Sequence, residues 1–465
     1  MIRLIFVLLC TLIVSCNSST PKGTVDKLPN ILFLFADDYT FDAIQALGND
    51  VIETPNLDRL VRNGTQFSQT FNMGGWNGAV CIASRSMIIT GKTIWKAKAL
   101  TDRWAKKENL ESAGKSWGKL MENKGYQTYM SGKWHVSIDP RKIFQTVRNI
   151  RPGMPRDFFK KENQKGYDRP KEGEIDLWSP TDSLNGGFWE GGKHWSEVIK
   201  DDALDFLNQS KEKESPFFMY LAFNAPHDPR QSPQSFLDRY PLEKIPLPEN
   251  WLPEYPYKDA IGNPKTLRDE ALAPFPRTPF AIKTHIKEYY AIISHLDQQI
   301  GEILDALEAS GKANNTYIFF TGDHGLSVGK HGLLGKQSMF DHSIRVPLIM
   351  AGPDIPKNKS IDHEVYLQDI MATSLELGNI TPPPSIEFKS FLSLAKGKDN
   401  ATPYPNGIYG AYMDSQRMVR KDGFKLMVYP KIKKILLFDL KNDPLEQHDI
   451  SDKIRHRNTI KNLFE

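Results

Sequence analysis

Short apolar runs along the chain mark the positions where buried strands are expected. Five of them stand out: residues 30–36 (NILFLFA), 127–130 (QTYM), 217–223 (FFMYLAF), 317–320 (YIFF) and 346–350 (VPLIM). Uninterrupted apolar runs of this length are typical of strands that are covered on both faces, and such strands occur mainly in parallel sheets. The pattern therefore predicts a large, mainly parallel sheet.

Helical periodicity lies between these runs. Apolar residues recur at spacings of three and four in residues 54–63, 116–124 and 286–310, which predicts helices that cover the sheet. The alternation indicates an α/β fold with helices on the faces of the sheet. After TPPPS at 381–385, short alternating segments separated by turns predict a smaller antiparallel sheet in a C-terminal subdomain, residues 381–465.

Polar residues follow four of the predicted strands directly. In open α/β sheets the carboxyl ends of the strands form the crevice where ligands bind, so we expect these residues to converge on one pocket. Taken singly, an Asp at such a position could cap a helix and a lone His could be structural. The segments are Asp37 and Asp38 after the first run, SGKWH at 131–135, NAPHD at 224–228 and TGDHG at 321–325.

Composition limits the classes of function. The chain has 465 residues, of which 40% are hydrophobic, so it can bury a large core in two or three structural units. Its net charge is only +4 and no basic block stands out, which argues against nucleic-acid binding. An anionic ligand would therefore be bound by a local site and not by the overall charge.

The N-terminus predicts export. Residues 1–16 combine one Arg with an apolar stretch that is too short for an ordinary membrane-spanning helix, as in a signal peptide. The stretch ends in Ile-Val-Ser-Cys16, which resembles the lipobox of bacterial lipoproteins, where the Cys becomes the acylated N-terminus; cleavage without a lipid is the alternative. Residues 17–27 would form a tether to the membrane. The mature protein would be periplasmic or attached to the outer membrane or cell surface.

Cys81 is the one cysteine left to the folded body, because Cys10 and Cys16 belong to the signal peptide and the lipidation site. An internal disulfide is therefore impossible, and an unpaired Cys in an exported protein is expected to be buried, modified or used. Glycines precede Cys81, and residues 83–89 predict a short helix ending near Gly91. The Cys would lie at a helix N-terminus, which favours anions, with Arg85 one turn away.

The segment CIASR at 81–85 resembles the C-x-P-S-R signature of type I sulfatases of the alkaline phosphatase superfamily, in which a separate maturation enzyme converts the Cys to formylglycine. Other family motifs occur in the same order over residues 29–450, as in bacterial polysaccharide sulfatases. The resemblance implies an alkaline-phosphatase-like catalytic domain over residues 28–380. The motifs are Asp37-Asp38, TPNLDRL at 54–60, GKWH at 132–135, APHDP at 225–229, TGDHG at 321–325, GKHGLLGK at 329–336, RVPLI at 345–349 and FDLKNDPLEQHDI at 438–450.

The resemblance also implies a metal site. One divalent cation, usually Ca²⁺ in this family, would be bound by Asp37, Asp38, Asp323 and His324, with the formylglycine formed from Cys81 completing the shell. Carboxylates suit such a hard cation. His324 stands where Asn is more common and resembles the Asp-His pair of iduronate-2-sulfatase-like members. A nitrogen ligand leaves Mg²⁺ and Mn²⁺ open.

Catalytic roles follow from the same resemblance. The hydrated aldehyde at position 81 would attack sulfur, while Arg85, Lys133 and Lys336 stabilise the charge on the sulfate group. His227 would protonate the leaving alcohol and His135 would take the proton that allows sulfate to be expelled, although these two roles could be exchanged. Ala83 replaces the Pro of the signature, which bears on how efficiently the maturation enzyme recognises this chain.

The substrate is predicted from export and from aromatic loops. A sulfated polysaccharide or its oligosaccharides is expected, algal such as ulvan or carrageenan first and glycosaminoglycans second. Trp189, His194 and Trp195 could contact a sugar or simply pack the loop over residues 140–195. Two other classes remain: a phosphatase or phosphodiesterase of the same superfamily, which usually has Thr or Ser as nucleophile, and a non-catalytic glycan-binding lipoprotein.

Overall fold

The computed structural model describes residues 27–153, 165–183, 189–398 and 401–465. The predicted signal peptide 1–16, the lipidation site Cys16 and all of the tether except Lys27 lie outside these ranges. Within them, no helix combines the length and the apolar character needed to cross a bilayer.

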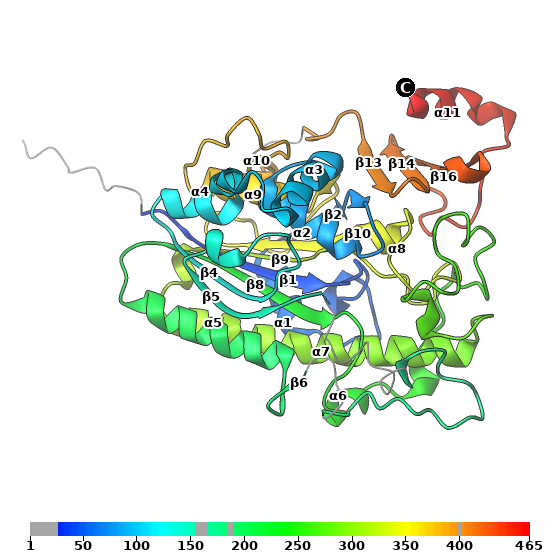
Figure 1. Ribbon diagram of the computed structural model, residues 1–465, viewed down its shortest axis with the longest axis horizontal. Coiled ribbons are helices and arrows are strands. Elements are labelled where there is room, and N and C mark those ends of the chain that lie inside the picture. The colour runs from blue at the N-terminus through cyan, green and yellow to red at the C-terminus, as the bar shows by residue number, and fades with distance from the viewer. Residues whose placement is uncertain (1–26, 154–164, 184–188, 399–400) are drawn as a thin grey trace, which may run out of the picture.

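A nine-stranded sheet forms the centre of the molecule (Figure 1). Its strands follow the order β11–β2–β10–β9–β1–β8–β4–β5, and β12 pairs with β2. All neighbours pair in parallel except those of β10, which confirms the mainly parallel sheet predicted from the apolar runs. The bounds are β1 (Asn30–Asp37), β2 (Thr65–Phe71), β4 (Gln127–Lys133), β5 (Thr146–Arg151), β8 (Phe217–Pro226), β9 (Thr316–Gly322), β10 (Arg345–Ala351), β11 (Lys359–Ile361) and β12 (Val365–Tyr366).

The direction of β10 is set by its connection to β9. A parallel return would need a crossover of a dozen or more residues, usually a helix, that carries the chain back over the sheet. Residues 323–344 instead contain the four-residue helix α8 (Asp341–Ile344) as their only α-helix. The connection therefore stays at the carboxyl edge of β9, where it carries Lys336, and β10 runs back antiparallel.

Helices cover both faces of the sheet. On one face α1 (Pro55–Asn63), α5 (Trp195–Lys211) and α7 (Pro279–Ala309) bury their apolar sides in one core. The other core is covered by α2 (Val80–Thr90), α4 (Trp117–Asn123) and α9 (Asp369–Leu377) (Figure 1). The helix α7 begins seven residues before the predicted start because Thr278 caps it and Pro279 occupies its first turn. The remaining helices are α3 (Ile94–Ala105), α6 (Gln234–Leu237), α10 (Leu392–Ala395) and α11 (Arg457–Phe464).

A smaller sheet follows in the order β16–β15–β14–β13–β3, and its four C-terminal strands are antiparallel, as predicted. The fifth strand, β3 (Gly74–Gly75), belongs to the loop before Cys81 and pairs in parallel with β13. Gly74 has φ +97°, and a Cβ there would lie 2.0 Å from the Ala411 carbonyl oxygen, so only glycine allows this approach. The C-terminal strands are β13 (Ile408–Tyr412), β14 (Gln416–Lys421), β15 (Phe424–Tyr429) and β16 (Lys434–Asp439).

The aromatic residues near 190 pack against the protein itself. The short strands β6 (Trp189–Glu190) and β7 (Lys193–His194) pair, and the His194 side chain caps α5 by accepting from the Ser196 amide. Trp195 is buried beneath Arg151, whose guanidinium lies 3.5 Å from the ring centroid. The sequence left two roles open for these side chains, contact with a sugar and packing within the loop. The structure shows internal packing for His194 and Trp195.

Candidate active site

The predicted site residues converge at the carboxyl ends of four parallel strands. β1 ends at Asp37, β4 at Lys133, and β8 and β9 lead directly into His227 and Asp323. Because these strands are parallel neighbours, their ends lie at one edge of the sheet. A cavity of about 400 Å³ opens there, lined by Gly78, Ala79, Cys81, Lys133, His135, Gly153, His227, Leu267, Arg268, Asp269, Lys336 and Gln337.

Three buried carboxylates and a histidine form a compact cluster beneath this cavity. Asp323 Oδ1 accepts the Asp38 backbone N–H at 3.1 Å, and His324 Nε2 lies 3.4 Å from Asp38 Oδ1. One potential ligand atom from each of Asp37, Cys81, Asp323 and His324 lies within 4.8 Å of the others. Hard oxygen ligands at this spacing are those that a divalent cation takes.

The pKa values of the cluster residues and their unpartnered atoms suit the binding of a cation. Burial, reinforced by the charge of Asp323, raises the pKa of Asp37 well above its ordinary value, and burial also raises the pKa of Asp38. Although burial disfavours its charge, Asp323 and Asp38 raise the pKa of His324 to about 9. Among the described residues, Asp37 Oδ1 and His324 Nε2 have no hydrogen-bond partner. An unpartnered carboxylate oxygen beside a histidine held charged by two carboxylates suits a cation, which would replace the proton on His324 Nε2.

Cys81 lies between this cluster and the cavity. Helix α2 begins at Val80, three residues before the predicted helix, because the glycine-rich loop already ends at Gly78; Cys81 therefore lies in its first turn. Its Sγ is 3.2 Å from His135 Nδ1. Burial alone would raise the pKa of this thiol, but the charges of Lys133 and His135 outweigh it and hold the pKa well below its ordinary value.

Arg85 is the most rigidly held cation of the site. The side chain is fully buried, with Nε donating to Asp323 Oδ2 at 2.9 Å and Nη1 donating to the Lys133 carbonyl at 2.8 Å. The guanidinium lies 4.7 Å from the centroid of the Phe35 ring. Its Nη2 has no hydrogen-bond partner among the described residues and is 3.7 Å from Asp37 Oδ1. The Arg85 guanidinium is thus held in one orientation, and its Nη2 remains a donor without a hydrogen-bond acceptor.

Two lysines and a third histidine, His227, lie beside the carboxylates. Lys133 pairs with Asp37, and Lys336 Nζ lies 2.9 Å from both Asp38 Oδ1 and His227 Nε2. The His227 Nδ1 lies 2.6 Å from the Asp228 carbonyl oxygen, to which it donates. Burial and the neighbouring charge of Lys336 lower the pKa of His227 well below its ordinary value. His227 is therefore neutral and fixed in one tautomer.

The structure thus brings every residue predicted for the site to one place. Sequence reasoning missed the cavity residues Gly153, Leu267, Arg268, Asp269 and Gln337. Arg268 forms ion pairs with Asp228 and Asp269, and Gln337 donates to Asp269 Oδ2 at 2.6 Å. Gln337 directly follows Lys336 and could have been found by that adjacency. Residues 267–269 lie in a segment without periodicity, which offers no such signal.

In a mainly parallel α/β fold, a buried cysteine at a helix start, a carboxylate cluster and several cations surround one small cavity, an arrangement that suits an ester hydrolase acting on an anionic ester. The chain belongs to the sulfatase family: residues 29–380 match the family described as Sulfatase, and residues 329–465 match the C-terminal family of N-sulphoglucosamine sulphohydrolase. It is therefore a sulfuric ester hydrolase. The sulfatase resemblance seen in the motifs is confirmed.

Several relatives support this assignment. A protein of Formosa agariphila described as a sulfatase is 29% identical over 91% of this chain and 84% of its own length. An ulvan-active sulfatase of the same organism is 28% identical over 83% of this chain and 72% of its own length. The solved structure of BT4656 in complex with its substrate D-glucosamine-2-N,6-O-disulfate has a TM-score of 0.72 and 24% identity, covering 94% of this chain and 96% of that chain. This last likeness shows the fold.

Proposed function

We propose that this protein hydrolyses sulfate esters of a sulfated glycan, using formylglycine made from Cys81 and one divalent cation. The observation that carries the proposal is the position of Cys81: its Sγ is 3.2 Å from His135 and within 4.8 Å of ligand atoms from Asp37, Asp323 and His324. A hydrated aldehyde there would present an oxygen nucleophile to the sulfate group.

Asp37, Asp38, Asp323 and His324 would hold the cation, together with the oxygen at position 81. The three carboxylates favour Ca²⁺, and the nitrogen of His324 keeps Mg²⁺ and Mn²⁺ as alternatives. A cation bound there supplies Lewis-acid charge neutralisation next to the nucleophile. The raised pKa values of Asp37 and Asp38 support this assignment, because burial disfavours both charges despite Lys133 and Lys336, and a bound cation would offset that cost.

The side chains around position 81 supply the other parts of the reaction. Arg85 presents its unpartnered Nη2 and orients the group at position 81, while Lys133 and Lys336 neutralise the sulfate oxygens. His135 takes a proton from the group at position 81, since its Nδ1 already contacts the atom there. His227 lines the cavity and its Nε2 accepts a hydrogen bond from the Lys336 ammonium, so a proton from Lys336 would pass through His227 to the leaving alcohol.

The substrate class is proposed from the cavity and from the relatives. A volume of about 400 Å³ suits one sulfated sugar ring and not a long polymer segment. One relative is described as ulvan-active, and the structural neighbour holds a sulfated glucosamine. We therefore infer a sulfated polysaccharide or its oligosaccharides, with export and lipidation at Cys16 placing the enzyme where such glycans are met.

The test is mass spectrometry of the tryptic peptide of residues 63–85, after co-expression with a formylglycine-generating enzyme. Conversion of the thiol to the aldehyde lowers the peptide mass by about 18 Da. The converted protein should hydrolyse 4-methylumbelliferyl sulfate or a sulfated monosaccharide, and Cys81→Ala should not. A fully unmodified Cys81 in active protein would disprove the formylglycine mechanism, and converted protein inactive on every sulfate ester would disprove the function.

A further inference from the structure

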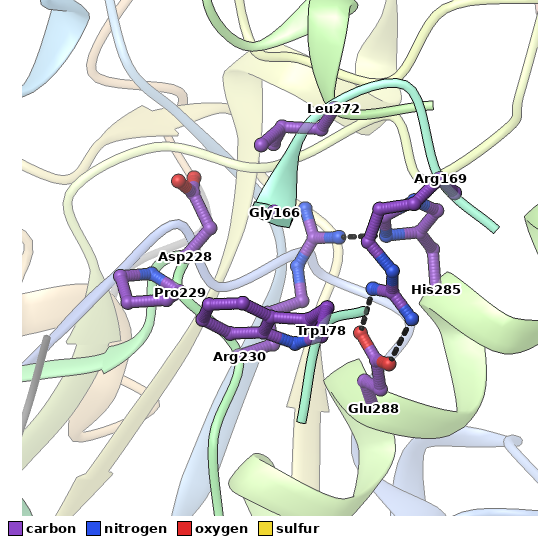
Figure 2. Close-up of a pocket in the computed structure, with 9 residues that line it drawn as sticks. All are labelled: Gly166, Arg169, Trp178, Asp228, Pro229, Arg230, Leu272, His285 and Glu288. Carbon is purple, nitrogen blue, oxygen red and sulfur yellow. Dashed lines mark hydrogen bonds and ion pairs between the residues drawn. The ribbon is translucent and has the colours of Figure 1, made fainter. Parts of the chain in front are cut away.

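A second, smaller pocket adjoins the catalytic cavity. Its enclosed volume is about 20 Å³, and Figure 2 shows the side chains that surround it. Asp228 lines this pocket, whereas its ion-pair partner Arg268 and its chain neighbour His227 line the catalytic cavity. The Asp228–Arg268 pair therefore separates the two. The lining residues are Gly166, Arg169, Trp178, Asp228, Pro229, Arg230, Leu272, His285 and Glu288.

Arg230 is the charged side chain of this pocket that lacks a counter-ion. Arg169 makes ion pairs with Glu288 and Asp176, each at 2.6 Å, and Asp228 is paired with Arg268. The Arg230 guanidinium lies in the middle of the pocket (Figure 2), is 3% exposed and has no carboxylate within ion-pair distance among the described residues. A buried, unmatched charge is costly, which indicates that this position serves a ligand.

The one hydrogen bond of Arg230 goes to a neutral partner. Its Nη1 donates to His285 Nδ1 at 2.9 Å, while His285 Nε2 donates to the Arg169 carbonyl at 2.9 Å. His285 therefore carries its proton on Nε2 and contributes no negative charge. The Arg230 Nε is buried without a hydrogen-bond partner in the described part of the chain. Arg230 thus keeps donor capacity that matches an oxyanion in a planar, forked geometry.

Resting on the proposed function, we infer that Arg230 binds an anionic substituent, a carboxylate or a second sulfate, on the sugar next to the one that carries the scissile sulfate. The enclosed volume is about that of one water molecule, so the tip of a substituent enters and a sugar ring stays outside. Arg230 follows His227 by three positions, which limits their Cα atoms to about 11 Å apart. An adjoining sugar of the same glycan can span that separation.

The experiment compares four sulfate esters on the converted enzyme. Three are disaccharides that share one 6-sulfated N-acetylhexosamine and differ in the second sugar: glucuronate, its carboxyl-reduced form, and a sulfated hexose. The fourth, 4-methylumbelliferyl sulfate, has no second anion. We expect the wild type to have a KM about 10- to 100-fold lower for the preferred anionic disaccharide than for the neutral one, the effect of a charge-assisted contact. The KM values of the glucuronate and the sulfated-hexose disaccharides show whether the subsite prefers a carboxylate or a sulfate. Equal KM values for all three disaccharides would overturn the inference without any variant.

The variant Arg230→Met should remove that preference while kcat and the hydrolysis of 4-methylumbelliferyl sulfate stay unchanged. Arg239→Met, a neighbouring arginine that pairs with Glu53 outside both cavities, is the matched control. If Arg230→Met slows the aryl sulfate as much as the disaccharides, Arg230 only supports the loop of His227 and the subsite is disproved. If converted wild type hydrolyses nothing, the proposed function fails separately. Calorimetric titration of that inactive protein with the glucuronate and the sulfated-hexose disaccharides then decides the pocket, since binding lost in Arg230→Met supports it and no binding of either overturns it.

Discussion

Two groups of buried carboxylates in this protein differ in how their charges are matched. At the catalytic edge, Asp37 and Asp38 have raised pKa values and Asp37 Oδ1 has no hydrogen-bond partner among the described residues. At the junction of the two sheets, Asp341 lies 2.5 Å from Lys425 and 3.0 Å from Arg420. These charges overcome burial and hold the pKa of Asp341 below its ordinary value.

The difference separates a site prepared for ligands from one that joins two parts of the fold. Lys425 also pairs with Glu446, and burial raises the pKa of Glu446 to about 7, so of these two junction carboxyls only Asp341 has a lowered pKa. In the candidate active site, burial and the charge of Asp323 keep the pKa of Asp37 raised despite the neighbouring Lys133 and Arg85. Unmatched buried charge is tolerated where function needs it and reduces stability there.

Asp37→Asn tests the catalytic side of the comparison and has the largest expected effect. We expect sulfatase activity to fall by about 10²- to 10³-fold or more, because a ligand of the cation is lost. In chelator, the Tm should stay within about 2 °C of the wild type or rise, since burial and Asp323 disfavour the charge of Asp37 even beside Lys133. Kinetics and calorimetry measure both. A Tm lower by many degrees in chelator would mean that Asp37 is as well matched as Asp341.

Asp341→Asn should have the opposite effects from Asp37→Asn: a large loss of stability and little change in activity. Lys425 and Arg420 would remain buried without their shared partner, which costs about 3–5 kcal/mol of unfolding free energy. Activity at low temperature should change little, because Asp341 does not line the catalytic cavity.

Urea unfolding at several pH values checks this prediction. The pKa of Asp341 is lower in the folded state, so its contribution is present above the unfolded pKa of about 3.9 and is lost as the pH falls further. The difference in unfolding free energy between the wild type and Asp341→Asn should therefore become smaller in acid. An equal deficit at all pH values would point to packing and not to charge.

The cation gives a third contrast. Ca²⁺ at 100 times its Kd should stabilise the chelated protein by about 2.7 kcal/mol, because it binds only the folded state. Asp341→Asn should keep this gain and Asp37→Asn should lose most of it. Mg²⁺ and Mn²⁺, titrated in the same thermal assay, show which cation the His324 site prefers. A gain that survives in Asp37→Asn would place the cation elsewhere.

Local sequence signals predicted the catalytic side of this comparison far better than the junction. Apolar runs marked the strands, and each catalytic residue follows a strand or lies in a short motif, so Asp37 and Asp323 were found from their neighbours alone. The junction joins Asp341 to residues 79 and 84 positions away, Arg420 and Lys425, through pairings that no local pattern encodes. Arg230 and Arg268 were missed for the same reason, since their roles depend on which carboxylates the fold brings near.

Gly153 supplies the smallest and most local test. A Cβ at this position would lie 2.3 Å from His135 Cε1, so Gly153→Ala must displace the ring whose Nδ1 contacts Cys81. Displacing a proton-transfer group by about 1 Å can cost up to 10²-fold in rate, and we expect about 10-fold here because the ring can partly adjust. Gly114→Ala, where no heavy atom lies within 4 Å of the new Cβ, is the matched control and should leave kcat unchanged.

Unchanged Tm with reduced kcat in Gly153→Ala alone would show that the close approach of Gly153 orients His135. Equal kcat in both variants would mean that the ring has room to move without loss, and that His135 is not the proton acceptor at position 81.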